Sequence, residues 1–373
     1  MSKEDYKEFR PGVLNQEQVL NLDGAVIHNL KNEAVDLSAF DLHISQQGWE
    51  MKGSIKASQN TNIDKIIREF SEHALSNGGP WILKTGKTYI FALREYLTLP
   101  NNSKLFGQAT GKSSIGRLDV LTRLMVNNCP SFDTIKDDGY KGSLYLEVTP
   151  ITFPIQVQEG NALCQLRLFR GLPEWSEIKE EELQLFGPMI LKEDGEPKIV
   201  DVKELTVNLM PDEKGISVFG TKEKKEIEEK NIVVDLTKGT EFHNPKEFWE
   251  DIKLKKDFTL EITPERFYIL RSKERFKLPL NVAVSCQAVS ETLGELRIHY
   301  AGFVHPGFGF DREKGTPIIF EVRGHNVTTF LRDGETLAHF KYYWMSERCK
   351  EQKKSGYEEQ ELKLSRYFKE WTK

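Results

Sequence analysis

The amino-acid sequence predicts a mainly β protein built from two similar halves. Short runs rich in Val, Ile, Leu, Phe and Tyr recur along the chain, and Gly, Pro, Asn or Asp residues bound them. Such runs between turn-forming residues are typical of β-strands joined by tight turns. In chain order, we expect strands within residues 81–83, 89–93, 144–148, 155–157, 163–169, 267–270, 282–285, 318–322 and 337–343.

One helix is expected, at residues 63–75. Apolar residues recur there at the spacing of a single helix face. They are Ile63, Ile66, Ile67, Phe70 and Leu75. Asn62 directly precedes the first of them, and asparagine is a residue type that commonly caps a helix.

The second half of the chain repeats the first. The matching segments are 99–102 with 278–281, 108–109 with 287–288 and 114–118 with 292–296, followed by Glu147 with Glu321 and Gly160 with Gly334. Because the matches keep their order, they indicate a duplication. We therefore expect two domains, 1–178 and 179–373, with Gly160 and Gly334 in equivalent turns.

Composition limits the functions that the chain can have. With 38% hydrophobic and 29% charged residues, a net charge of -5 and a pI near 6.0, the chain is not expected to bind nucleic acid. No apolar run is long enough to span a membrane, and the first ten residues are charged, unlike a signal peptide. Four scattered cysteines indicate reduced thiols, so we expect a cytoplasmic protein.

Residues 107–147 contain both parts of a candidate site. Lys112, Ser113 and Ser114 form a basic, hydroxyl-rich turn, and such a turn suits the oxygens of a phosphate. Glu147 lies in an expected strand, which would hold its carboxylate rigidly. The structural alternatives are an ordinary Gly-Ser turn and a surface glutamate on a strand, and these residues alone leave both open.

Three familiar catalytic motifs do not occur in the sequence. A Walker A loop needs four residues between its first glycine and the Gly-Lys pair, but three separate Gly107 from Gly111. Zinc-dependent base deaminases carry H-x-E and P-C-x-x-C, and neither pattern is present. The G-x-S-x-G turn of serine hydrolases is missing as well.

The remaining residues resemble the deoxycytidine triphosphate (dCTP) deaminase family of the trimeric dUTPase superfamily. The segments that carry the resemblance are Leu99-Pro100, Lys112-Ser113-Ser114-Ile115-Gly116-Arg117, Asp137-x-x-Tyr140-x-Gly142, Glu147 and, near the N-terminus, Ser38-Ala39-Phe40-Asp41-Leu42. The resemblance covers most of residues 11–170 and returns more weakly in residues 258–345. This two-copy arrangement looks like the long bacterial form of the enzyme. It implies tandem dUTPase-like distorted β-barrels, the β-clip fold, with a few short helices.

The resemblance also implies a role for each matching residue. Glu147 lies seven residues after Tyr140, as the glutamate of the deaminase branch does, and would be the general base that activates water. Ser113 would orient the water, and Arg117 would fix Glu147 or balance developing negative charge. Substrate binding is assigned to Lys112, Ser114, Asp137, Tyr140 and, in a C-terminal lid, Tyr357 and Gln360.

The implied activity is hydrolysis of dCTP to dUTP and ammonia without zinc, with Mg²⁺ entering on the triphosphate. Two alternatives stay open. Asp137 and Tyr140 would also suit a dUTP diphosphatase, or a bifunctional enzyme that both deaminates dCTP and cleaves dUTP. A nucleotide-binding trimer without catalysis is the other alternative.

The second copy departs from the pattern at the phosphate turn. Glu291 and Glu295 stand where the first copy has Ser113 and Arg117, and two carboxylates there would repel a triphosphate. We therefore expect Glu321, the counterpart of Glu147, to be catalytically silent. Because active sites in the superfamily form between neighbouring barrels of a trimer, the resemblance also implies a homotrimer in which the second copy completes or braces the first copy's site.

Overall fold

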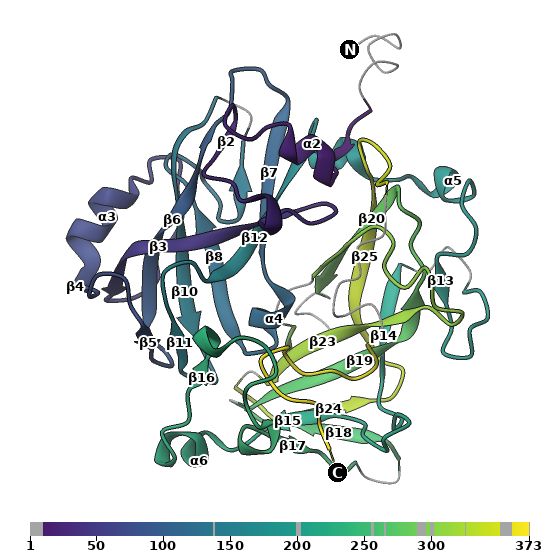
Figure 1. Cartoon of the computed structure of the whole chain (residues 1–373). Helices are drawn as coiled ribbons and strands as arrows, with labels where there is room; N and C mark the ends of the chain where they lie inside the picture. The colour runs from purple at the N-terminus through teal and green to yellow at the C-terminus, as the bar shows by residue number, and fades with distance from the viewer. Residues whose placement is uncertain are drawn as a thin grey trace.

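The computed structural model describes residues 10–136, 139–198, 203–254, 257–264, 266–288, 296–298, 302–324, 326–350 and 360–372. Two ten-stranded sheets dominate it, one in each half of the chain. They curl into two barrel-like bodies that lie side by side, the first purple to teal and the second green to yellow (Figure 1). The expected mainly β fold of tandem barrels is confirmed.

The first half contributes twelve strands. They are β1 Gly12–Val13, β2 Ile27–His28, β3 Phe40–Met51, β4 Ser71–Ala74, β5 Trp81–Leu83, β6 Thr88–Thr98, β7 Leu105–Gly111, β8 Val120–Met125, β9 Thr134–Ile135, β10 Lys141–Pro150, β11 Ile155–Val157 and β12 Ala162–Arg170. The second half contributes β13 Ile190–Leu191, β14 Glu204–Asn208, β15 Phe219–Thr221, β16 Val234–Asp235, β17 Trp249–Asp251, β18 Thr259–Ile262, β19 Phe267–Phe276, β20 Val282–Ala288, β21 Leu296–Ile298, β22 Phe303–Val304, β23 Thr316–Gly324, β24 Thr329–Arg332 and β25 Thr336–Trp344. Every strand expected from the sequence lies within one of these.

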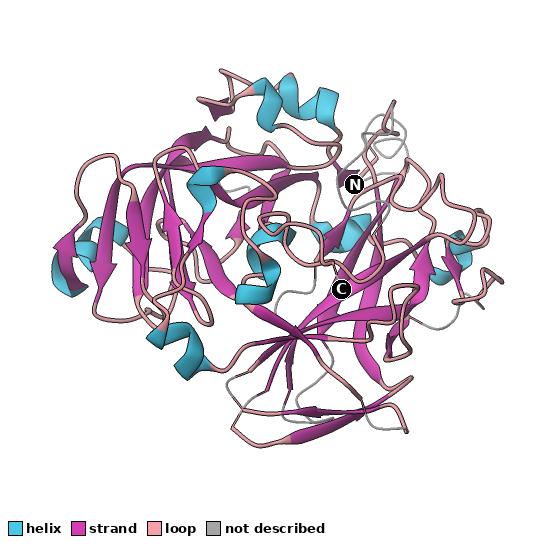
Figure 2. Cartoon of the chain, turned by 60° about the horizontal axis from the view of Figure 1, so that its bottom comes forward, coloured by secondary structure: helices cyan, strands magenta, loops and turns pink. Residues whose placement is uncertain are grey.

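Helices are short and few (Figure 2). The α-helices are α2 Gln16–Leu20, α3 Ile63–Phe70, α4 Ser113–Gly116, α5 Glu180–Leu183 and α6 Lys224–Glu229, with 3₁₀ turns η1 Asn32–Ala34, η2 Pro173–Ser176, η3 Leu236–Lys238 and η4 Pro245–Glu247. None of the helices in the described ranges is long and apolar enough to cross a membrane.

The expected helix over residues 63–75 is too long. Asn62 caps it as predicted, since its side chain accepts a hydrogen bond from the backbone N–H of Lys65 at 2.9 Å. The helix ends at Phe70, however, because Ser71 adopts an extended conformation and begins β4. This strand pairs with β3, and the sheet pairing overrides the helical pattern of the sequence.

The two sheets have the same topology, as the duplication predicts. The order β10-β6-β3-β12-β7-β9 in the first matches β23-β19-β14-β25-β20-β22 in the second. Glu147 and Glu321 occupy β10 and β23, which are equivalent strands. Gly160 and Gly334 have φ angles of 87° and 85°, so both form the turns before β12 and β25 for which glycine is suited.

The two halves share part of their hydrophobic core. Strand β16 of the second half pairs with β11 of the first, and the core of the first barrel includes Phe248 and Trp249. The described part of the C-terminal tail returns to this core and buries Leu364, Tyr367 and Phe368. The second half and the tail therefore pack against the first barrel over a wide area.

Candidate functional site

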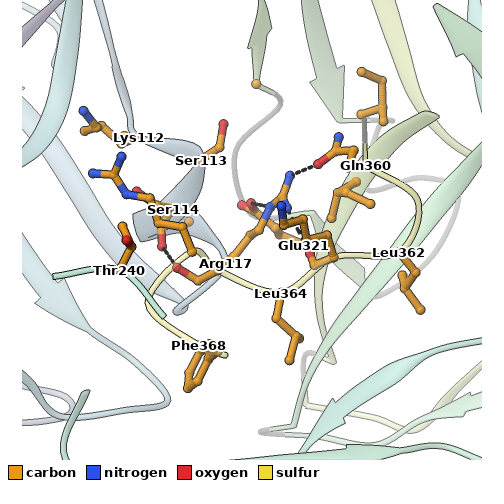
Figure 3. Close-up of a pocket in the computed structure, with 18 of the residues that line it drawn as sticks. Lys112, Ser113, Ser114, Arg117, Thr240, Glu321, Gln360, Leu362, Leu364 and Phe368 are labelled. Carbon is orange, nitrogen blue, oxygen red and sulfur yellow. Dashed lines mark hydrogen bonds and ion pairs between the residues drawn. The ribbon is translucent and has the colours of Figure 1, made fainter. Parts of the chain in front are cut away.

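A cavity of about 900 Å³ lies between the two halves. Its walls come from α4 and the residues beside it in the first half, from β23 in the second half, and from the C-terminal segment, defined here as residues 360–372. Figure 3 shows the side chains of these three parts converging. The cavity therefore exists only because the two copies face each other.

The basic turn of the first half forms one wall. Lys112 precedes the short helix α4 (Ser113–Gly116), and its ammonium group is paired with the carboxylate of Asp41 on β3. Ser113 is exposed to the cavity, whereas Ser114 is buried. The turn thus offers a hydroxyl and a half-buried cation to whatever enters.

Arg117 ends this turn and ties it to the C-terminal segment. Its side chain is buried, donating from Nη2 to Gln360 Oε1 at 2.7 Å and from Nη1 to the backbone carbonyl of Lys363 at 2.9 Å. The Ser365 hydroxyl donates to the backbone carbonyl of Ser114 at 2.6 Å. The segment consequently lies against the residues expected to bind the nucleotide.

Glu321 projects from the opposite wall toward the same turn. It is 6% exposed, and its Oε1 lies 4.0 Å from the Nε of Arg117. Burial raises the pKa of Glu321 well above its ordinary value; Arg117 opposes this shift and Asp119 adds to it. The carboxylate also approaches the α-carbon of Gly116 so closely that a β-carbon there would overlap it.

A second ion pair crosses the boundary beside this one. Arg323 donates from Nε to Asp119 Oδ2 at 2.9 Å, and Thr152 donates its hydroxyl to the same oxygen at 2.5 Å. Arg117 and Asp119 belong to the first half, while Glu321 and Arg323 belong to the second. Two cations and two carboxylates thus balance each other in a largely buried place, as buried charges require.

The structure brings together five of the residues predicted from the sequence. Lys112, Ser113, Ser114, Arg117 and Gln360 all line the cavity. Of the described residues that were assigned to the site, Glu147 and Tyr140 do not line it. Asp137, Tyr357, Glu291 and Glu295 lie outside the described residues.

Glu147 has different surroundings. Ser54 donates its hydroxyl to Glu147 Oε1 at 2.9 Å, and Arg123 lies opposite Glu147 on the neighbouring strand. Burial raises the pKa of Glu147, and its Oε2 has no hydrogen-bond partner among the described residues. The Tyr140 hydroxyl donates to the backbone carbonyl of Ser143 at 2.6 Å. Within this chain, Glu147 and Arg117 therefore lie in different surroundings, and the role of Glu147 as general base stays a prediction.

Glu321 lines the cavity, although the sequence did not lead us to expect it there. We expected Glu321 to serve a separate, silent site, whereas it faces the turn of the first copy. The available signal was that sites of the resembled superfamily form between barrels. The apolar residues Leu362 and Leu364 among the charges of the tail were a further signal, because both line the cavity.

The arrangement can support acid–base chemistry on an anionic ligand. A buried carboxylate of raised pKa holds a proton more readily than an exposed one, which suits a group that accepts a proton and returns it. The exposed Ser113 hydroxyl and the cations Lys112 and Arg117 can bind polar or negatively charged groups beside it. In the described part of the chain, no three His, Cys, Asp or Glu side chains cluster as they would to hold a metal ion.

Two family models match the chain and together cover nearly all of it. The 2′-deoxycytidine 5′-triphosphate deaminase (DCD) N-terminal domain matches residues 10–172, and the DCD C-terminal domain matches residues 176–368. Both halves thus match domains of one family.

Individual proteins agree with these matches. A structure of 2′-deoxycytidine 5′-triphosphate deaminase from Agrobacterium tumefaciens is 30% identical, with a TM-score of 0.79, over 91% of this chain and 99% of that one. A relative from Bifidobacterium adolescentis named "dCTP deaminase, dUMP-forming" is 28% identical over 149 residues, which are 35% of this chain and 72% of the relative. A relative of the same name from Parafrankia is 36% identical over 133 residues, 31% of this chain and 62% of the relative.

Proposed function

Because the chain belongs to the 2′-deoxycytidine 5′-triphosphate deaminase family, we propose that it hydrolyses dCTP at C4 of the cytosine ring in the cavity between its two halves. The observation that carries this proposal is the convergence of the Lys112–Arg117 turn with a buried carboxylate across that cavity. The reaction adds water and releases ammonia.

Glu321 is the general base in this proposal, in place of Glu147. Its carboxylate takes a proton from water as the oxygen bonds to C4 and passes this proton to ring N3. It then takes the proton of the new C4 hydroxyl group and delivers it to the amino group, so that the C4–N bond breaks, ammonia leaves and the C4 carbonyl forms. Three facts support this assignment: Glu321 is buried, its pKa is raised, and it lies beside Arg117. A base works best when its pKa is close to the operating pH.

The first half supplies the binding groups. Ser113 orients the water or the tetrahedral centre, and Arg117 balances the charge that develops there. Lys112 and Ser114 bind the triphosphate, with Gln360 of the C-terminal segment closing over the nucleotide. Mg²⁺ enters on the phosphate oxygens, which suits an ion that is bound mainly through substrate phosphates.

A second candidate is the conversion of dCTP to dUMP. The observation that favours it is the name "dCTP deaminase, dUMP-forming" of the relatives that match part of this chain. Such an enzyme would also cleave the triphosphate, releasing diphosphate. The two candidates share the deamination step and differ in their final product.

One incubation tests both candidates. The protein is mixed with dCTP and Mg²⁺, and ammonia, dUTP, dUMP and diphosphate are quantified over time. Deamination alone gives ammonia and dUTP in equal amounts, whereas the second candidate gives ammonia, dUMP and diphosphate. Parallel reactions with a zinc-specific chelator and with EDTA test the metal requirement, because only EDTA should slow the reaction. Absence of ammonia from all reactions would refute the proposed function.

Replacing Gly116 by Ala should lower kcat sharply with little change in overall stability. The added methyl group would overlap the Glu321 carboxylate, so either Glu321 or α4 must move away from the bound ring. A displacement of about 1 Å at a catalytic group can reduce the rate roughly 10²-fold. Steady-state kinetics and thermal unfolding measure the two effects.

Gly187→Ala is the matched control for this substitution. A β-carbon at Gly187 meets no atom within 4 Å, so this variant should behave like the wild type. Equal kcat values for the Gly116→Ala and Gly187→Ala variants would show that Glu321 does not need its close approach to α4.

A further inference from the structure

Three arginines of the second half converge on one carboxylate. Glu361 accepts a hydrogen bond from Arg275 Nη1 at 3.1 Å, from Arg271 Nη1 at 3.3 Å and from Arg312 Nη2 at 3.2 Å. Arg275 makes a second, shorter contact with the same group through Nη2. Arg271, Arg275 and Arg312 are called the arginine cluster below.

Among the residues that the structure describes, the arginine cluster carries more positive charge than its carboxylate partner can balance. Glu361 supplies one negative charge to three cations, and the next carboxylate, that of Glu193, lies 4.0 Å from Arg271 and is itself half exposed. Although burial alone would raise the pKa of Glu361, Arg275 and the other two arginines hold it below its ordinary value. Buried cations without balancing anions destabilise a fold. The arginine cluster therefore favours the binding of a ligand with more than one negative charge.

Two members of the cluster, Arg271 and Arg275, do not depend on Glu361 for their geometry. Arg275 also donates from Nε to the backbone carbonyl of Lys314 at 2.9 Å, and Arg271 donates from Nη2 to that of Met210 at 3.1 Å. The side chains of Arg271 and Arg275 are only 5% and 9% exposed. Their guanidinium groups are therefore held in position by the fold, and would remain so if Glu361 left.

The position of the cluster connects it to the cavity. Arg271 on β19 lies opposite Ile319 of β23, two residues from Glu321, so it shares a sheet face with Glu321. Glu361 itself lines the cavity, directly after Gln360. An anion that displaced Glu361 would thus be bound at the edge of the same cavity.

We propose that the arginine cluster is a binding site for the phosphate groups of a polyphosphate, and that Glu361 occupies this site until such a ligand displaces it. Carboxylate and phosphate oxygens are both bound by the fork of a guanidinium group, and phosphate carries the larger charge. The phosphates could belong to the substrate nucleotide or to a separate polyphosphate, and competition distinguishes these two sources.

Calorimetric titration of the full chain with inorganic triphosphate, without divalent cations, tests the proposal. Glu361→Gln should bind triphosphate about tenfold more tightly than the wild type, because the competing charge is gone, and Arg275→Gln about tenfold more weakly, on the scale of one charge-assisted interaction. Glu159→Gln is the matched control: it removes the same charge from a carboxylate that is paired with an arginine, Arg94, outside the cavity, and should change nothing.

A misfolded variant would not bind triphosphate more tightly than the wild type. Tighter binding by Glu361→Gln therefore cannot result from misfolding, and the test remains decisive. If Glu361→Gln binds triphosphate no more tightly than the wild type, the cluster only anchors the C-terminal segment and the proposal fails. Repeating the titration with dCTP present identifies the source: loss of triphosphate binding supports the substrate's own phosphates, and unchanged binding supports a separate polyphosphate. The titration with triphosphate alone involves no turnover, so its result stands apart from the deamination assay.

Discussion

Replacing Glu321 by Gln is expected to reduce the kcat for dCTP deamination by roughly 10² or more, the contribution of a general base. Glutamine keeps the size and much of the hydrogen bonding of the side chain, but it cannot take a proton from water. Nucleotide binding should persist, since the phosphate-binding turn belongs to the other half of the chain. Ammonia release measures kcat, and calorimetry with dCTP measures binding.

Glu147→Gln is the matched control. It makes the same chemical change at the equivalent position of the other sheet, at a residue that is also buried. Because Glu147 lies with Ser54 and Arg123 and not with Arg117, its replacement should cost only a small fraction of the activity lost in the Glu321 variant. If the two variants exchange these outcomes, Glu147 is the base, and the site must form between separate chains.

Replacing Arg117 by Gln should move the acid limb of the kcat–pH profile to higher pH. In the proposed mechanism Glu321 must be ionised, so the rate should fall as the pH drops below the pKa of this group. Burial raises that pKa and the Arg117 guanidinium lowers it, so loss of the guanidinium must raise it further. An opposite charge at close range typically lowers the pKa of a carboxyl group by about 1–3 units, and the acid limb should shift upward by a comparable amount.

Arg117→Lys separates this electrostatic effect from a loss of packing. Lysine keeps the charge but cannot reproduce the two bonds to Gln360 and Lys363. Its profile should keep an acid limb close to that of the wild type, even if kcat is lower. An unshifted limb in the Arg117→Gln variant would show that Arg117 does not act through the ionisation of Glu321.

The fold was largely predictable because its signals are local. Each strand expected from β-favouring residues between turn residues is present, and Gly160 and Gly334 form matching turns. The exception, the helix expected to reach residue 75, fails because β4 pairs with a strand distant in sequence. A helical pattern in a sequence does not reveal that competing partner.

The candidate site was predictable only in part for a similar reason. Lys112, Ser113, Ser114 and Arg117 are consecutive or nearly so, and one turn places them all. Which carboxylate lies beside these residues depends on which sheet packs against that turn. The duplication produced two equivalent glutamates, and proximity in the sequence favoured Glu147, whereas Glu321 is the one that faces the turn. The second copy has lost its own phosphate turn, but this loss does not show which of its strands faces the first copy.

The presence of both cavity walls on one chain has a consequence for how the enzyme responds to dilution. In an assembly of separate barrels, the catalytic carboxylate meets its partner arginine only while the subunits stay associated. Here both halves belong to one chain. The effective concentration of one cavity wall at the other therefore does not change with the amount of protein. The homotrimer of two-barrel chains that the resemblance implies stays a prediction, but the cavity proposed here has both walls on one chain. Specific activity should accordingly stay constant as the protein is diluted.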